Sequence, residues 1–157
     1  MRRATRDDIS AIVALYADDI LGAARESPDD LAPYEVAFDR IAATNGVTTV
    51  LVAERDGVIV GTLQLSVLPG LSHRGANRTQ LEAVRVSAAA RGGGIGTEMI
   101  RWAIDEARRR GCGLIELTSN RQRTDAARFY ERLGFVPSHN GFKLPLPPAD
   151  GVSVEGR

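Results

Sequence analysis

The pattern of apolar and polar positions in the first seventy residues predicts two helices and then two strands. Apolar side chains recur at three- and four-residue spacing in both helical stretches, and Thr5 with Asp8 resembles a capping box that opens the first. β-branched residues fill the two strand stretches, and Asp56-Gly57 between them is typical of a tight hairpin turn. The predicted helices span 5–17 and 31–43, and the predicted strands span 47–54 and 58–67.

Strands and helices then alternate along the second half of the chain. A polar loop over 71–78 precedes a third strand, and Thr124 is the expected N-cap of the last helix. The predicted elements are strands over 80–86 and 113–119, helices over 95–110 and 124–133, and a closing hairpin of 135–138 with 142–146 across Asn140-Gly141. This order predicts one mixed α/β (α+β) domain over residues 1–146, followed by a mobile tail over 147–157.

Composition narrows the class of protein. The chain has 157 residues, of which 43% are apolar and 25% charged, as in an ordinary globular domain. Basic and acidic residues balance at 20 each, so the chain lacks the basic footprint of a nucleic-acid or anionic-membrane binder. No apolar run is long enough to span a bilayer and the start does not resemble a signal peptide, so a cytoplasmic protein is expected. One cysteine and two histidines predict neither a disulfide nor a metal site.

The most informative motif is the run Arg91-Gly92-Gly93-Gly94-Ile95-Gly96, between the predicted strand 80–86 and the next helix. Glycines let backbone N–H groups approach an anion closely, and a helix start offers such groups with partial positive charge. The run is therefore a candidate phosphate site, although three glycines also suit a loose surface loop. It fails as a P-loop because Thr97-Glu98 stands where Lys-Ser/Thr is required, and it lacks the third glycine of the dinucleotide-binding fingerprint.

Two motifs together resemble the GNAT N-acetyltransferase superfamily. Arg91-x-x-Gly94-x-Gly96 after Val84-Arg85-Val86 is similar to its acetyl-CoA signature, and Phe129-Tyr130-Glu131-Arg132-Leu133-Gly134-Phe135 is similar to its closing motif. The two motifs lie one helix, one strand and one loop apart, and the order of elements matches along nearly the whole chain. The resemblance implies a mixed, mostly antiparallel central sheet flanked by about four helices.

The resemblance also implies acetyl-CoA as co-substrate, without a metal, and the residues that hold it. The backbone of the glycine loop would carry the pyrophosphate beside Arg91. Pantetheine would run along the strand like an added strand, with backbone contacts to Val84 and Val86, two positions that also fit plain core. The loop residues concerned are Gly92, Gly93, Gly94, Ile95, Gly96 and Thr97.

Two side chains are candidates for proton transfer. Tyr130 matches the superfamily's tyrosine near the thioester sulfur and is the candidate general acid, since a phenol of ordinary pKa is protonated at neutral pH. Glu82 is the candidate general base, because strand alternation puts it on one face with Val84 and Val86, where a carboxylate is unusual unless it is used or paired. The alternatives are that Tyr130 only packs on its helix and that Glu82 forms an ion pair with an arginine.

Other expected site residues carry weaker signals. Asn120 resembles the polar residue after the fifth strand that contacts the co-substrate or a water, and its alternative is an ordinary turn residue. Arg123 stands seven residues before the tyrosine, where many members carry asparagine, which puts that contact in doubt. The acceptor site is expected between the first two helices and the loop 71–78. Its candidates, each more readily a solvated loop residue, are Arg25, Glu26, His73, Arg74 and Asn77.

The leading hypothesis is an acyltransferase that moves an acetyl group from acetyl-CoA to a primary amine of a small molecule or peptide by direct attack. The alternatives are a non-catalytic acyl-CoA-binding or sensor domain of the same fold and an interaction module with a vestigial site. Neither the balanced charge nor the motifs identify the acceptor amine, because fold and donor site are shared across many acceptors. The oligomeric state stays open, with a homodimer as one option.

Overall fold

The computed structural model describes residues 1–18 and 22–146. It divides the chain into two compact units, one of residues 1–117 and one that begins at Thr118. The single domain predicted over 1–146 stays a prediction. So does the mobile tail, because residues 147–157 lie outside the described residues.

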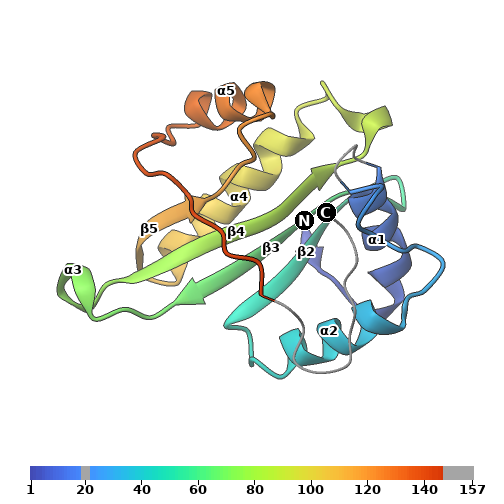
Figure 1. Ribbon diagram of the computed structural model, residues 1–157, viewed down its shortest axis with the longest axis horizontal. Helices are drawn as coiled ribbons and strands as arrows, with labels where there is room; N and C mark the ends of the chain where they lie inside the picture. Colours follow the sequence, from blue (N-terminus) through green and yellow to red (C-terminus); the bar gives the residue numbers. More distant parts are fainter. Residues whose placement is uncertain (19–21, 147–157) are drawn as a thin grey trace. The chain divides into compact units, whose positions relative to one another are not determined.

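The first unit is built on a five-stranded sheet whose strands lie side by side in chain order (Figure 1). Its strands are β1 (Arg2–Arg3), β2 (Thr48–Arg55), β3 (Val58–Leu68), β4 (Asn77–Val86) and β5 (Cys112–Leu117). Neighbouring strands are antiparallel except β4 and β5, which are parallel. The prediction of a mixed, mostly antiparallel sheet is therefore confirmed.

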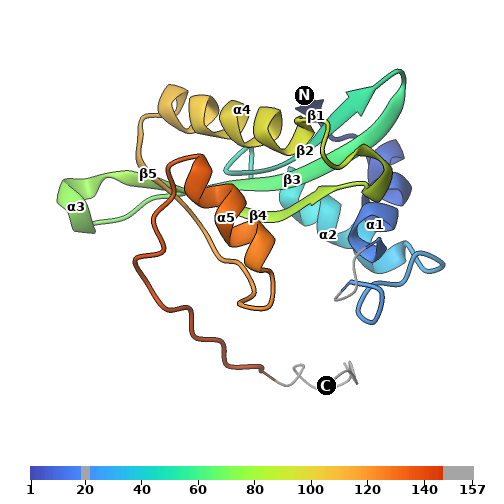
Figure 2. The ribbon, with the colours of Figure 1, turned by 90° about the horizontal axis from the view of Figure 1, so that it is seen from above.

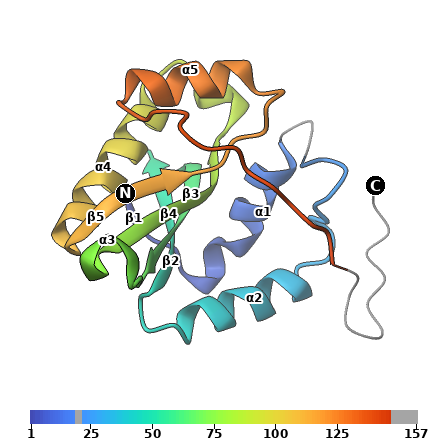
Figure 3. The same cartoon turned by 60° about the vertical axis from the view of Figure 1, so that its left-hand side comes forward.

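Helices cover both faces of this sheet. The helical elements of the first unit are a 3-10 turn over Arg6–Asp8, α1 (Ile9–Ala17), α2 (Ala32–Ala42), the short α3 (Ser72–Gly75), a 3-10 turn over Ala88–Ala90, and α4 (Ile95–Arg109). Helix α4 lies on one face (Figure 2), and α1 and α2 lie on the other (Figure 3). Among residues 1–18 and 22–146, no helix is long and apolar enough to cross a membrane.

The two faces of the sheet can be told apart by their contacts. Val52 of β2 packs with Ile12 of α1, and Thr62 lies opposite Val52 in β3 and therefore on the same face. On the other face Gly61 lets α4 approach closely, because a Cβ there would lie 2.6 Å from the sulfur of Met99. Side chains level with Thr62 thus face α1, and those level with Gly61 face α4.

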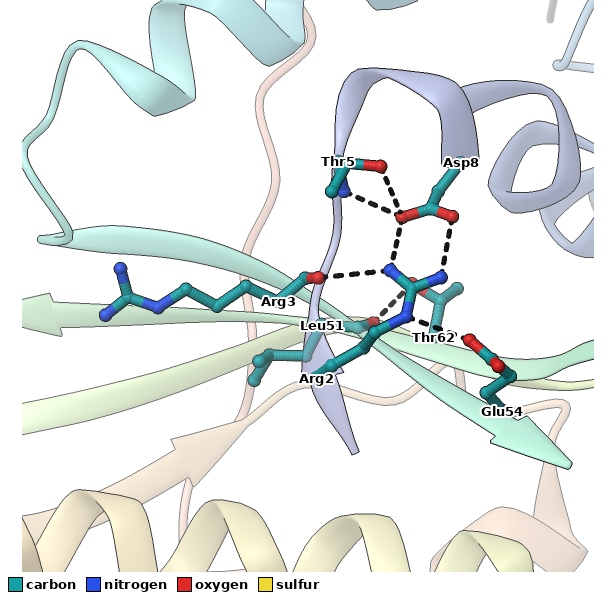
Figure 4. Close-up of polar contacts among 7 residues, drawn as sticks. All are labelled: Arg2, Arg3, Thr5, Asp8, Leu51, Glu54 and Thr62. Carbon is teal, nitrogen blue, oxygen red and sulfur yellow. Dashed lines mark hydrogen bonds and ion pairs between the residues drawn. The ribbon is translucent and has the colours of Figure 1, made fainter. Parts of the chain in front are cut away.

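A buried carboxylate joins the N-terminal strand to the first helical turn (Figure 4). Asp8 accepts hydrogen bonds from the backbone N–H and the hydroxyl of Thr5, at 2.7 and 3.1 Å, as the predicted capping box requires. Arg2 donates two more to Asp8, at 2.6 and 2.9 Å, and one to Glu54 of β2 at 2.9 Å. The Arg2 guanidinium holds the pKa of the Asp8 carboxyl well below its usual range, and Thr5 adds to the effect.

The C-terminal end of α4 is tied to the loop that enters β2. Glu106, whose side chain is 10% exposed, accepts hydrogen bonds from Arg109 at 2.6 and 2.7 Å and from Arg110 at 2.6 Å. Arg110 also donates to the Gly46 carbonyl at 2.7 Å. These hydrogen bonds, from Arg109 first, outweigh the effect of burial and lower the pKa of Glu106 to about 2.

The described part of the second unit contains α5 (Thr124–Arg132) and corrects two predictions. The N-cap residue is Arg123 rather than Thr124. The hairpin predicted over 135–138 and 142–146 is wrong, since the described residues there form no strand. Pro137 has no N–H to donate to a strand, and the Ser138 N–H turns back to the Val136 carbonyl at 2.9 Å, so this segment bends on itself instead of pairing.

Candidate active site

The glycine loop lies where the sequence predicts it, between β4 and α4. Gly92 and Gly94 have φ values of 80° and 82°, in the left-handed region that favours glycine, and open space surrounds the position of a Cβ at each. Both residues are exposed, as is Gly93 between them. The backbone of the loop is thus accessible to a ligand at the start of a helix.

Helix α4 begins with amides that the helix itself does not use. Its first amide to donate along the helix is that of Glu98, to the Gly94 carbonyl at 3.0 Å. The N–H groups just before it, of Ile95, Gly96 and Thr97, belong to the first turn, which has no carbonyl one turn earlier. Such a set of N–H groups, with the positive end of the helix dipole, suits an anion.

Arg91 stands beside this loop with its side chain oriented by neighbours. Its Nε donates to the Val86 carbonyl at 3.2 Å, and its Nη2 donates to the Asp18 carbonyl at 3.5 Å. The side chain is 56% exposed, so it can meet solvent or a ligand at the same time. Its position fits the predicted place beside a phosphate, and the contact itself stays a prediction.

Strand β4 continues past the end of its parallel neighbour. The pairing with β5 runs from Asn77 opposite Cys112 to Leu81 opposite Leu117, where β5 ends. Residues 82–86 of β4 extend beyond that point, and a short segment with the 3-10 turn Ala88–Ala90 joins them to the glycine loop. An edge of this kind can hydrogen-bond to an extended ligand as a strand would. The edge suits the amide-containing pantetheine arm of acetyl-CoA, and the loop amides suit its pyrophosphate.

A β-bulge changes which side chains of β4 share a face. Gln64 and Thr62 of β3 pair with Glu82 and Arg85, so two steps along β3 correspond to three along β4. Ala83 is the residue in this stretch with a left-handed backbone, at φ 50°. Arg85 therefore shares the α1 face with Glu82, whereas Val86 lies opposite Gly61 on the α4 face. The expectation that Glu82, Val84 and Val86 share one face is wrong, because alternation does not continue through a bulge.

Glu82 lies in an exposed position rather than on a buried apolar surface. Its Oε2 accepts a hydrogen bond from Nε2 of Gln64, directly across on β3, at 3.1 Å. A solvent-exposed carboxylate of this kind can reach an acceptor amine through water. Its role as a base stays a prediction.

Arg85 brings a positive charge to the same face. It is half-buried, and its Nη1 donates to the Val84 carbonyl at 2.9 Å. Tyr16 of α1 lies close enough to feel this charge: burial raises the pKa of Tyr16 to about 12, and the field of Arg85 opposes that rise. The face between α1 and β4 thus carries a carboxylate, a guanidinium and a phenol.

Tyr130 and Asn120 belong to the second unit. The Tyr130 ring meets Phe129 and Phe135 edge-on, with ring centroids 5.1 and 5.7 Å apart, so it packs within its own motif. Asn120 is exposed and accepts a hydrogen bond from the Gln122 N–H through Oδ1 at 2.9 Å, which matches the turn residue weighed as its alternative. The co-substrate contact of Asn120 and the acid role of Tyr130 stay predictions.

The residues proposed for the acceptor site fall into two groups. Arg25 and Glu26 lie in the loop before α2, where Glu26 accepts a hydrogen bond from the Tyr34 hydroxyl at 3.0 Å. His73 and Arg74 lie in the α3 turn and Asn77 begins β4 just after it, at the opposite end of β4 from the glycine loop (Figure 1). The ten residues of β4 span about 30 Å at ordinary strand rise, so the structure does not bring that second group to the donor loop.

Sequence reasoning missed three contributors to this region. Asp18 contacts both Ala88 and Arg91, although it directly follows a helix and belongs to no motif. Gln64 reaches Glu82 through strand register, and Arg55 of β2 lies near the glycine loop, 3.8 Å from a Cβ built on Gly93. The one sequence signal for any of these residues is the hairpin turn at Asp56-Gly57, which places Arg55 at the end of β2 where that strand turns into β3.

Known proteins resemble this chain along most of its length. The model of the GNAT acetyltransferase family matches residues 9–135. The aminoalkylphosphonate N-acetyltransferase of Salmonella typhimurium is 33% identical over 149 residues, which cover 93% of this chain and 90% of that protein. The glucosamine 6-phosphate N-acetyltransferase of Trypanosoma brucei brucei is 30% identical over 130 residues, which cover 82% and 86% of the two chains.

A solved structure supports the same assignment of the fold. A transcriptional regulator from Bacillus halodurans C-125 superposes with a TM-score of 0.88 at 43% identity and covers 92% of this chain and 97% of its own. The family match, the two enzyme relatives and the sheet with its glycine loop agree with one another. The chain therefore belongs to the GNAT family of acetyltransferases and is an acyltransferase.

Proposed function

We propose that this protein transfers an acetyl group from acetyl-CoA to a primary amine of a small molecule, by direct attack of the amine. The observation that carries the proposal is that the exposed glycine loop follows, after a short stem, the stretch of β4 that extends beyond the end of β5. The loop amides suit the pyrophosphate of acetyl-CoA, and the strand edge suits its pantetheine arm. A peptide amine is the less favoured acceptor, because both enzyme relatives are named for small molecules.

The donor site uses mostly backbone groups. The N–H groups of residues 92–97 receive the pyrophosphate, and Arg91 adds a positive charge beside them. The backbone of Val84 and Val86 hydrogen-bonds to the pantetheine arm, and Asn120 adds a polar contact. This division leaves the side chains of the α1 face for the acceptor.

Two side chains move protons. Acetyl-CoA supplies an activated acyl carbon, whose bond to sulfur breaks as its bond to the amine nitrogen forms. Glu82, directly or through a water, takes the proton that the ammonium must lose to become a nucleophile. Tyr130 gives its phenolic proton to the sulfur that leaves, and it regains a proton as the attacking nitrogen loses its second proton to form the amide.

The acceptor class follows from charge on the α1 face and from the relatives. The named substrates of both enzyme relatives carry an amine and a phosphonate or phosphate. Here Arg85 shares a face with Glu82. An acceptor whose amine lies at Glu82 can therefore place its phosphonate or phosphate against the Arg85 guanidinium, which binds such groups through two N–H groups. We therefore propose a small amine that bears a phosphonate or phosphate.

The test is release of free thiol from acetyl-CoA with matched pairs of amines. Glucosamine 6-phosphate with glucosamine and 2-aminoethylphosphonate with propylamine differ chiefly in the anionic group. We expect kcat/KM to be higher for the anionic member by about tenfold or more, the effect of one charge-assisted contact. Arg85→Gln should abolish that preference while the neutral amine keeps its rate.

Variants of the proton-transfer residues complete the test. Glu82→Gln and Tyr130→Phe should each lower kcat by about a hundredfold or more. Glu116→Gln on β5 is the matched control and should keep full rate. Full activity in both proton-transfer variants would refute their roles. Equal rates within each amine pair would refute the acceptor class, and tight binding of CoA without turnover of any amine would favour a sensor.

A further inference from the structure

The C-terminal end of α1 is joined to the segment that leads into the glycine loop. Asp18, the residue that follows α1, accepts a hydrogen bond through Oδ2 from the backbone N–H of Ala88 at 2.8 Å. Its carbonyl accepts another from Nη2 of Arg91 at 3.5 Å, and its carboxylate lies 4.0 Å from the same nitrogen. Asp18 thus reaches two points of the stem, the residues 87–91 that precede the glycines.

Two further hydrogen bonds hold the stem in place. The Ser87 N–H donates to the Val60 carbonyl of β3 at 2.9 Å, and Nε of Arg91 donates to the Val86 carbonyl at 3.2 Å. Of the glycines that follow, Gly92 and Gly94 have open space around the position of a Cβ, and glycine has the widest backbone freedom of any residue. The stem therefore fixes the point at which the chain enters the glycine loop, and Asp18 supplies its contact to α1.

The stability of α1 does not account for an aspartate at this position. The Asp18 N–H ends the helix by donating to the Ala14 carbonyl at 3.0 Å, a bond that any residue other than proline could make. A carboxylate at a helix C-terminus lies at the negative end of the dipole, where a cation is favoured. What the carboxylate contributes is its contact with Ala88 and Arg91.

We propose that Asp18 is a positioning residue of the donor site. By holding Ala88 and Arg91 it orients the amides of the glycine loop, and the arginine beside them, toward the pyrophosphate of acetyl-CoA. The inference rests on the proposed function, because it assumes that this loop receives the donor. It adds a link from α1, on the acceptor face, to the donor loop across 70 positions of sequence.

Two variants and a matched control separate positioning from general stability. Asp18→Ala removes both contacts of the carboxylate, whereas Asp18→Asn keeps an oxygen for the Ala88 N–H and removes the charge near Arg91. Asp105→Ala is the control, because Asp105 is an exposed aspartate that pairs with Arg108 at 3.0 Å on the outer side of α4. Each full-length protein is measured by hydrogen exchange without ligand, by calorimetric binding of CoA, and by steady-state kinetics.

We expect Asp18→Ala to speed exchange of the Ala88 amide in the absence of CoA and to weaken CoA binding about tenfold, the effect of losing one hydrogen bond to a charged group. Its kcat at saturating acetyl-CoA should stay within about twofold, since the reacting groups are untouched. Asp18→Asn should keep the Ala88 amide protected and fall between wild type and Asp18→Ala in affinity. Asp105→Ala should match wild type in all three measurements.

Two results would overturn the inference. One is unchanged CoA affinity in Asp18→Ala, and the other is a loss of affinity in Asp18→Asn as large as in Asp18→Ala despite a protected Ala88 amide. Failure of the proposed function looks different, because the wild-type protein itself would then bind no CoA. A wild type that binds and turns over acetyl-CoA beside an unaffected Asp18→Ala refutes only the positioning role.

Discussion

Glu82 and Arg85 lie on the same face of β4, although residues three apart in a regular strand lie on opposite faces. The cause is the bulge at Ala83, whose φ of 50° is left-handed. For a residue with a Cβ, that conformation costs about 1–2 kcal/mol. The strained bulge places Glu82, the proposed base, on the same face as Arg85, the proposed partner of the anion. Strained backbone conformations of this kind cluster at functional sites.

Substitution of Ala83 by glycine should stabilise the protein. Relief of the left-handed strain outweighs the extra entropy of glycine in the unfolded chain, so Ala83→Gly should raise the free energy of unfolding by up to about 1 kcal/mol. Ala83→Val should lower it, because a β-branched residue is least suited to this region. Urea denaturation measures both. Ala103→Gly, in the interior of α4, should be destabilising, and an equal loss in Ala83→Gly would contradict the bulge assignment.

The Asp8 carboxylate should stabilise the fold in a pH-dependent way. Asp8→Asn leaves Arg2 and the Thr5 N–H without an ionised acceptor, which should lower the free energy of unfolding at neutral pH by about 1–3 kcal/mol. The folded pKa of Asp8 is lowered, so this stabilisation is complete above the unfolded pKa of about 3.9 and is lost as the pH falls below it. Denaturation midpoints should therefore converge between wild type and variant in acid. A constant gap down to about pH 2 would rule out the linkage.

The two arginines that contact Glu106 should differ in importance. Arg110 has a side chain only 16% exposed and also bonds the Gly46 carbonyl, so Arg110→Met should lower the free energy of unfolding by about 1–3 kcal/mol. Arg109 is 69% exposed, and Arg109→Met should change thermal stability little. In NMR titration the Glu106 pKa of about 2 should rise in both variants, because each removes a cation that favours the carboxylate. Equal destabilisation by both substitutions would count against the role of the Gly46 contact.

Two buried threonines should respond oppositely to the same substitution. Thr79 and Thr62 are both fully buried, but within the described part of the chain the Thr79 hydroxyl has no hydrogen-bond partner, whereas that of Thr62 donates to the Leu51 carbonyl at 2.9 Å. Thr79→Val should raise the free energy of unfolding by about 1 kcal/mol, since it removes a polar group that is desolvated without compensation. Thr62→Val should lower it. Calorimetry on both variants tests the pair, and destabilisation by Thr79→Val would show that its hydroxyl is satisfied.

Glycine at position 94 should matter for binding as well as for folding. Gly94 and Gly111 have similar φ values, 82° and 68°, at opposite ends of α4, and a Cβ at either meets open space. Gly94→Ala and Gly111→Ala should therefore lose similar stability, about 1 kcal/mol, through backbone strain. Only Gly94→Ala should weaken CoA binding in calorimetry, because it alone lies in the donor loop. Equal affinity in the two variants would argue against this loop as the phosphate site.

Local sequence patterns predicted most elements of the first unit. The strand predicted over 58–67 is Val58–Leu68, and the helix predicted over 95–110 is Ile95–Arg109. Periodicity, capping residues and the Asp56-Gly57 turn act over a few residues, so they can be recognised without the fold. The predicted hairpin after Phe135 failed because pairing needs a partner strand, and Asn140-Gly141 indicates only a turn.

The sequence by itself determined the family and predicted the donor chemistry, because the glycine loop at a helix start and the motif around Tyr130 are each contiguous in the sequence. Tertiary structure decided what surrounds them. The face that Glu82 occupies depends on the register of β4 against β3, which shifts at Ala83. The support of the loop depends on how α1 crosses the sheet, which brings Asp18 to Ala88 across 70 positions. Neither relationship follows from spacing along the chain. Each depends on how separate elements pack together, and local sequence patterns do not specify that packing.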